Sequence, residues 1–83
     1  MVNVSVKILF LGPLRDIAGR DFIDVSAPLD WPALLAAVGS EVADQLNHEK
    51  VNIACAGTVL SDKTLLSASD GDEIALLPPV SGG

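Results

Sequence analysis

The sequence has 83 residues, which is the length of one small domain with a thin hydrophobic core. Its formal net charge is −6 and its 5 basic residues are scattered, so we expect no nucleic-acid partner and no binding to an anionic membrane surface. The single cysteine excludes an internal disulfide and a multi-cysteine metal site. One thiol, no visible secretory signal and no apolar run of membrane length together predict a cytoplasmic protein.

Two strands are predicted in the first third of the chain. Apolar side chains alternate through residues 2–11, which is the period of a strand. The side chains expected to face the core are Val2, Val4, Val6, Ile8 and Phe10. The opposite side ends with Leu9 and Leu11, which lie either under another element or in an exposed apolar patch. Residues 21–26 alternate again and predict a strand antiparallel to the first.

Helical patterns lie between and after these strands. Residues 14–18 predict a short helix. A longer helix begins after Asp30, a good N-cap, with Pro32 in its first turn. Its expected core face consists of Trp31, Leu34, Leu35 and Val38. Ser40 is expected to cap a further helix over residues 41–46.

The second half of the chain returns to strands. Residues 51–56 predict a strand with Cys55 on its inner face, and residues 59–60 predict a short edge strand. The sequence Asp-Gly-Asp at 70–72 indicates a tight turn before a last strand at 73–77. This order predicts an α+β fold of the ubiquitin-like β-grasp type. We expect a mixed sheet of four to five strands, one main crossing helix, and the first and last strands as central parallel neighbours.

Residues 78–83 predict a flexible tail that follows a domain over residues 1–77. Two prolines come first, and proline cannot donate to a sheet and holds φ near −65°. Gly82 and Gly83 have no side chain, so their backbone can pass through a gap where a Cβ would clash. An extended tail of this length reaches roughly 20 Å, far enough to carry the Gly83 carboxylate into a partner. The alternatives are a linker or fusion scar and simple strand termination by the prolines.

Three stretches carry a resemblance to a known family. They are Asp70 to Gly83 (DGDEIALLPPVSGG), Val6 to Leu11 (VKILFL) with the following Leu14-Arg15-Asp16, and Asp21 at the start of the second strand. Together they resemble the molybdopterin synthase small subunit, the ubiquitin-like sulfur carrier of molybdenum cofactor biosynthesis, over essentially the whole chain. The chain departs from the family at 55–57, where Cys-Ala-Gly stands at a place that commonly holds an asparagine.

The resemblance implies a mechanism in which Gly83 is the reactive residue. An E1-like adenylating enzyme uses ATP with Mg to convert the Gly83 carboxylate to an acyl-adenylate, and a sulfur donor protein then makes the thiocarboxylate. The large synthase subunit, in a heterotetramer with two copies of each chain, receives the tail and transfers the sulfur to cyclic pyranopterin monophosphate. The chain is then an enzyme only as a subunit of this sulfurtransferase, with no catalytic side chain and no bound cofactor or metal.

Further site residues follow from the tail and from the apolar positions near it. The expected tail-insertion residues are Gly82, Ser81, Val80, Pro79 and Pro78. A partner interface is predicted at Leu9, Leu11, Val59 and Leu77, since exposed apolar patches often mark partner sites. The alternative for each interface residue is packing beneath a helix or loop.

For the polar and cysteine residues that could have a function, a structural role is the favoured interpretation. Asp62, Asp70 and Asp72 could meet basic partner residues, but turn chemistry alone explains Asp70 and Asp72 and is favoured. Cys55 is expected in the core as a small hydrophobic residue rather than as a redox or persulfide site. His48 is expected on the solvated surface.

Three other functions remain open from the sequence. The first is a sulfur carrier for another pathway, such as thiazole synthesis or tRNA thiolation. The second is a ubiquitin-like modifier joined through its C-terminus to lysines of other proteins. The third is a β-grasp binding module whose tail has no chemical role.

Overall fold

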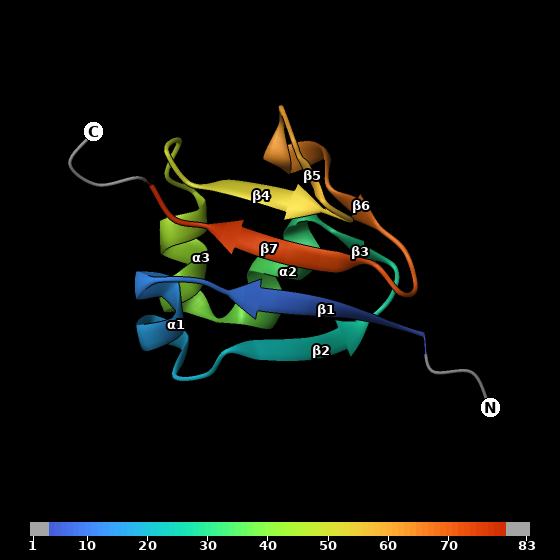
Figure 1. Cartoon of the computed structure of the whole chain (residues 1–83), viewed down its shortest axis with the longest axis horizontal. Coiled ribbons are helices and arrows are strands. Elements are labelled where there is room, and N and C mark those ends of the chain that lie inside the picture. The colour runs from blue at the N-terminus through green and yellow to red at the C-terminus, as the bar shows by residue number, and fades with distance from the viewer. Residues whose placement is uncertain (1–3, 80–83) are drawn as a thin grey trace.

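A computed structural model describes residues 4–79, and these form a five-stranded mixed sheet with helices packed on one face (Figure 1). In chain order the elements are β1 (Ser5–Phe10), α1 (Pro13–Ala18), β2 (Phe22–Ser26), β3 (Leu29–Asp30), α2 (Trp31–Val38), α3 (Ser40–Leu46), β4 (Asn52–Cys55), β5 (Thr58–Val59), the 3₁₀ turn η1 (Lys63–Leu65), β6 (Ser67–Ala68) and β7 (Glu73–Leu77). The predicted strands and helices are therefore all present, with small shifts at their ends.

The order of strands in the main sheet is β2-β1-β7-β4-β5. The first and last strands, β1 and β7, are parallel neighbours at its centre, as predicted, and their arrowheads point the same way in Figure 1. β2 pairs with β1 and β4 pairs with β7, both antiparallel, and β5 continues antiparallel from β4. This arrangement of a mixed sheet crossed by a helix confirms the predicted ubiquitin-like β-grasp fold.

Local chemistry explains where the helices begin and end. The carboxylate of Asp30 accepts a hydrogen bond from the backbone N–H of Ala33 at 3.0 Å, which confirms the predicted cap of α2. Gly19 ends α1 in the left-handed conformation, with φ of 75°. The expected capping role of Ser40 is wrong: Ser40 is already the first residue of α3, and the capping position belongs to Gly39, without a side-chain hydrogen bond.

A second, two-stranded sheet joins segments that the sequence pattern did not connect. β3 pairs antiparallel with β6, so that Leu29 lies opposite Ala68. Both side chains are buried and belong to the core. Strands of two residues are too short to show an alternating pattern, and for this reason the periodicity gave no indication of them.

One contiguous core lies between the main sheet and the helices. Its buried members are Val6, Ile8, Phe10, Leu14, Leu29, Leu34, Val42, Leu46, Val51, Ile53, Leu66, Ala68, Ile74 and Leu76. The alternation of β1 is as predicted from Val6 onward. The expected inward position of Val4 is wrong, because Val4 precedes the first paired residue of β1 and its side chain is 49% exposed. Val2 lies outside the described residues.

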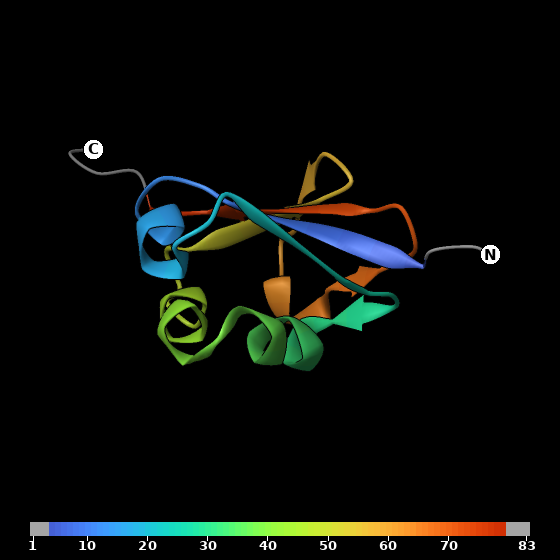
Figure 2. The same cartoon turned by 90° about the horizontal axis from the view of Figure 1, so that it is seen from below.

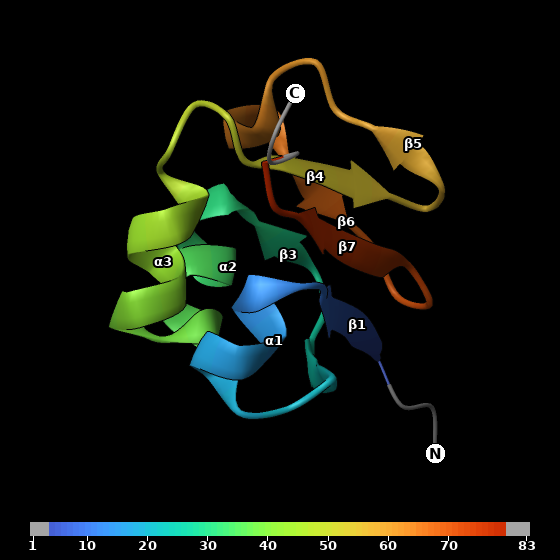
Figure 3. The same cartoon turned by 60° about the vertical axis from the view of Figure 1, so that its left-hand side comes forward.

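The helices cover one face of the sheet only. Figure 2 shows α2 and α3 below the sheet, and Figure 3 shows α1 beside α3, at the end of the sheet where β1 stops. Within residues 4–79 no helix covers the opposite face of the sheet (Figure 2). Nor does any helix in that range have the length and apolar character needed to cross a bilayer. We call this uncovered face of the sheet the open face, and the candidate site lies on it.

Replacing Leu34 by alanine is expected to lower the free energy of unfolding by about 2–5 kcal/mol, because it leaves a cavity in the core. Leu34 is fully buried, whereas the matched control Leu65 is 76% exposed, and its replacement by alanine should change stability by less than about 0.5 kcal/mol. Urea unfolding monitored by circular dichroism measures both values. Equal losses in the two variants would contradict the assigned core.

Candidate functional site

The open face of the sheet carries a row of apolar side chains, one from each strand. Register partners lie on the same face of a sheet, and Leu9 of β1 pairs with Phe22 of β2 on one side and with Ala75 of β7 on the other. Ala75 pairs with Ala54 of β4, which in turn pairs with Val59 of β5. We call these five residues the apolar row. With strands spaced by about 4.8 Å, the row spans about 19 Å across the sheet.

The apolar row is accessible to a partner along its whole length. Its two ends, Phe22 and Val59, are 47% and 57% exposed, and the three residues between them are half-buried. The inner face has the opposite character, since the neighbouring positions Ile8 and Ile74 are fully buried against the helices. A contiguous exposed apolar surface of this kind marks an interaction site more often than isolated exposed residues do.

Charged side chains border the apolar row on the side away from the tail. Lys7 pairs with Asp24 of β2 and with Glu73 of β7, so one positive and two negative groups form the next row of the same face. The Lys7 ammonium also lies 4.6 Å from the centre of the Phe22 ring, in a cation–π contact. The open face is therefore apolar in its middle and mixed in charge at this border.

The tail base, which we define as Leu77, Pro78 and Pro79, lies at the other border. β1 and β7 are parallel, so the chain leaves both strands at the same end of the sheet. Leu77 is held by pairing with Asn52 of β4, Pro78 is half-buried, and Pro79 is exposed. A partner that covers the apolar row therefore also meets the start of the tail.

The structure brings most of the predicted interface residues onto this one surface. Leu9 and Val59 belong to the apolar row, and Leu77 lies two residues beyond Ala75 on the same face. Leu11 follows β1 and is 38% exposed. The alternative that Leu9 and Val59 pack beneath a helix is excluded, since the helices lie on the other face (Figure 2). The predicted tail residues Val80, Ser81, Gly82 and Gly83 lie outside the described residues.

Three members of the apolar row were not predicted from the sequence. Phe22 carried an available signal, because the alternation that turned its neighbour Ile23 inward left a large aromatic residue facing outward. Ala54 and Ala75 carried none, because alanine occurs on either face of a sheet. Their place in the row follows only from the pairing of β4 with β7.

The acidic residues near the turns have local partners. The Asp70 carboxylate accepts a hydrogen bond from the Ser5 N–H at 2.9 Å, and the Asp72 carboxylate accepts one from the Ser69 N–H at 2.8 Å. The favoured turn role of both residues is confirmed. Asp62 likewise caps η1 by accepting from the N–H of Thr64 at 3.0 Å.

Cys55 is half-buried against the core, near its predicted place. Its Sγ lies 3.9 Å from Oδ2 of Asp72, with the thiol as donor. Burial raises the pKa of the Cys55 thiol, and the negative charge and the hydrogen-bond acceptor of Asp72 raise it further. A thiol in this setting is a poor nucleophile, because the thiolate is the reactive form.

Lys63 connects η1 to the loop before β4. Its ammonium donates hydrogen bonds to the carbonyl oxygens of His48 and Val51, the latter at 2.6 Å, and lies 5.9 Å from the ring centre of Trp31. Burial lowers the pKa of Lys63, while the nearby Glu49 acts in the opposite direction. These contacts hold the residue just before Asn52, so Lys63 supports the strand that flanks the tail base. The side chain of His48 is exposed, as predicted.

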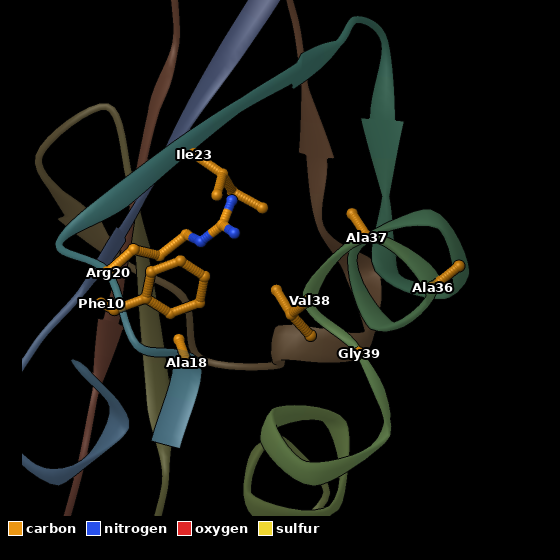
Figure 4. Close-up of a pocket in the computed structure, with 8 residues that line it drawn as sticks. All are labelled: Phe10, Ala18, Arg20, Ile23, Ala36, Ala37, Val38 and Gly39. Carbon is orange, nitrogen blue, oxygen red and sulfur yellow. The ribbon is translucent and has the colours of Figure 1, made fainter. Parts of the chain in front are cut away.

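A cavity of about 280 Å³ lies away from the open face (Figure 4). It is lined by Phe10, Ala18, Arg20, Ile23, Ala36, Ala37, Val38 and Gly39. Figure 4 shows the Arg20 side chain lying along the Phe10 ring toward Ile23. None of the predicted site residues that the structure describes lines this cavity, and residues 4–79 contain no cluster of side chains suited to a metal ion.

Comparison with known structures supports the fold. The Haloferax volcanii HVO 2177 protein superimposes with a TM-score of 0.74 at 22% identity, over 100% of this chain and 91% of that one. The small archaeal modifier protein 1 of Methanosarcina acetivorans superimposes with a TM-score of 0.69 at 26% identity, over 95% of this chain and 96% of that one.

Comparison of sequences identifies the family. The molybdopterin synthase sulfur carrier subunit of Escherichia coli (strain K12) is 34% identical over an alignment of 84 positions, which covers 94% of this chain and 99% of that protein. The sequence model of the ThiS family matches residues 8–83, from the middle of β1 to Gly83. With nearly its whole length matched, this chain belongs to the ThiS family.

Proposed function

We propose that this chain is the sulfur-carrier subunit of a molybdopterin synthase and that it carries sulfur as a thiocarboxylate at Gly83. The observation that carries the proposal is the 34% identity to the Escherichia coli sulfur carrier subunit over 99% of that protein. The Pro-Pro-Val-Ser-Gly-Gly ending at residues 78–83 supports it, because a tail that ends in two residues without side chains suits delivery of a terminal group into a partner.

The chemistry requires activation, because a carboxylate is a poor electrophile. An E1-like adenylating partner joins the Gly83 carboxylate to the α-phosphate of ATP with Mg, which releases pyrophosphate. A sulfur donor then delivers sulfur at the oxidation level of sulfide to the acyl carbon, and AMP leaves with the bonding electron pair, so that one oxygen is replaced by sulfur. When this sulfur has bonded to a pyranopterin in the large subunit, water cleaves the bond between the sulfur and the acyl carbon and supplies the oxygen that restores the carboxylate. Every acid, base and nucleotide contact comes from the partners.

The described surface fits this role in two ways. The apolar row offers a docking surface that a large subunit or an adenylating partner can cover in turn. The tail base leaves the sheet at the border of that surface, so that docking brings the tail to the partner's pocket. The proposal therefore divides the chain into a recognition domain and a reactive tail over residues 78–83, in a heterotetramer located in the cytoplasm.

A second candidate function is that of a ubiquitin-like protein modifier. The observation that favours it is the similarity to small archaeal modifier protein 1, at 26% identity over 95% of this chain. Both functions begin with activation of a C-terminal carboxylate, and they differ in the acceptor. A modifier forms an amide with a lysine of another protein, whereas a carrier gives up sulfur and is released unchanged.

Incubation with an E1-like adenylating protein, ATP and a sulfur source is expected to replace one oxygen of Gly83 by sulfur. Intact-mass spectrometry, with fragmentation to localise the change to the last peptide, measures the result. Deletion of Gly83 is the control and should abolish the change without affecting the folded domain. An unchanged mass with a demonstrably active adenylating protein would contradict the proposal.

The acceptor is identified in a second step with the thiocarboxylated chain. Addition of the large subunit and cyclic pyranopterin monophosphate should consume the thiocarboxylate and return the original mass. Formation of amide-linked adducts with lysine, and no loss of sulfur to the pterin, would instead support the modifier function.

Replacing Val59 by serine is expected to weaken binding of the large subunit by about tenfold, equivalent to about 1.4 kcal/mol, because it removes one exposed end of the apolar row. Leu65→Ser is the matched control, since Leu65 is 76% exposed but lies in η1, outside the apolar row. Isothermal titration calorimetry measures both dissociation constants. Equal weakening by both variants, or by neither, would show that the apolar row is not the docking surface.

Cys55 is expected to react slowly with iodoacetamide at pH 8 in the folded chain, and faster after unfolding, because its raised pKa keeps the thiol protonated. Asp72→Asn should increase the folded-state rate, since it removes the charge that raises the pKa while keeping an oxygen acceptor. The rates are measured by mass spectrometry. Rapid alkylation of the native chain would return Cys55 to consideration as a sulfur-carrying residue.

The same thiol predicts a pH dependence of stability. The folded chain holds the Cys55 proton to a higher pH than the unfolded chain, whose thiol titrates near its ordinary pKa of 9.0. The stability from the protonated thiol is therefore fully present below pH 9 and is lost as pH rises through the raised folded-state pKa. Cys55→Ala should flatten this alkaline decline in urea-unfolding measurements.

A further inference from the structure

The turn after β1 approaches the tail base closely. Gly12 connects β1 to α1, and a Cβ built on its backbone would lie 3.3 Å from Cγ of Pro78. This spacing is tighter than nine in ten real Cβ contacts. Two residues at opposite ends of the sequence therefore face each other where both central strands end.

Conformation as well as space requires glycine at this position. Gly12 has φ of 54° and ψ of −133°, a region that residues with a Cβ rarely adopt. The other glycines that the structure describes also have positive φ, but a Cβ at Gly19, Gly39, Gly57 or Gly71 would meet nothing within 4 Å. Among the described glycines, only Gly12 combines a positive φ with an atom of another residue close to its Cβ position.

Both sides of this approach are held in place. The Gly12 carbonyl accepts a hydrogen bond from the Arg15 N–H at 3.0 Å, which ties the turn to the first residues of α1. On the other side, Leu77 is paired with Asn52, and the ring of Pro78 fixes its own φ near −65°. Pro78 therefore leaves β7 in a restricted direction, with the Gly12 backbone as one wall of its path.

We propose that Gly12 is a positioning residue for the tail, because its missing side chain leaves open the path along which Pro78 and Pro79 leave the sheet. This inference rests on the proposed function where it concerns activation of Gly83. The tail then leaves the sheet in one fixed direction relative to a partner docked on the apolar row. A Cβ at residue 12 would push Pro78 aside and change that direction. Gly12 acts through Pro78 and touches no reacting atom.

The contact itself is tested without any activity measurement. In the unaltered chain, nuclear Overhauser effects are expected between the Gly12 Hα protons and the ring protons of Pro78. In a double-mutant cycle, Gly12→Ala should lower the melting temperature less in a Pro78→Ala background than alone, because the Cγ that it meets is gone.

Gly39→Ala is the matched control for this cycle. Gly39 has φ of 88° and ψ of 161°, a similarly strained conformation, but no atom within 4 Å of its Cβ position. Its effect should add to that of Pro78→Ala. Absence of the Overhauser effects, or additive effects for Gly12→Ala as well, would overturn the inference even where a variant folds poorly.

The activation assay tests the positioning role. For thiocarboxylate formation, Gly12→Ala is expected to lower kcat by about tenfold or more while KM stays within about twofold, because docking is intact and only the reacting group is misplaced. Gly39→Ala, compared at equal folded fraction, should retain the unaltered kcat. If the unaltered chain reacts and both variants behave alike, the inference fails while the proposed function stands. If the unaltered chain does not react, the proposed function fails, and the double-mutant cycle still decides whether Gly12 contacts Pro78 and so sets its position.

Discussion

The parallel pairing of β1 with β7 is the constraint on which the rest of the structure depends. It joins residues 5–10 to residues 73–77, almost the full length of the described chain apart. On the inner face this pairing sets Ile8 beside Ile74 and so begins the core. On the outer face it sets Leu9 beside Ala75, the middle of the apolar row. Because the strands are parallel, it also places the turn after β1 next to the exit of β7, where the tail begins.

The pairing register is secured at the end of the sheet away from the tail. The Asp70 carboxylate accepts from the Ser5 N–H, and the Gly71 N–H donates to the Ser5 carbonyl at 2.9 Å. The Lys7 N–H donates to the carbonyl of Asp72 at 3.1 Å. A slip of one residue would exchange the two faces of β7, turning Glu73 and Ala75 toward the core and Ile74 and Leu76 toward solvent. The acidic turn therefore contributes to the site indirectly, by keeping the outer face of β7 in register.

A domain of this size has little interior to spare for a catalytic pocket, and its organisation accords with a protein that acts through a surface and a tail. The helices cover one face of the sheet and leave the other for a partner (Figure 2). The cavity beside Arg20 lies away from that face. The activation and the acceptor of the carboxylate that we propose at Gly83 are therefore assigned to partners that recognise the same surface.

Features that depend only on residues close together in the sequence were determined by the sequence alone. The alternation in residues 73–77 defined β7 to the residue, and Asp30 marked the start of α2. For Leu9 and Val59 the sequence left both an exposed apolar patch and packing beneath another element open, whereas the predictions for residues 80–83 concern positions that the structure does not describe. Only the tertiary structure decided which outward residues share a row and that Gly12 meets Pro78, because both depend on the register of strands distant in sequence. Periodicity describes one strand at a time and contains no information about its neighbours.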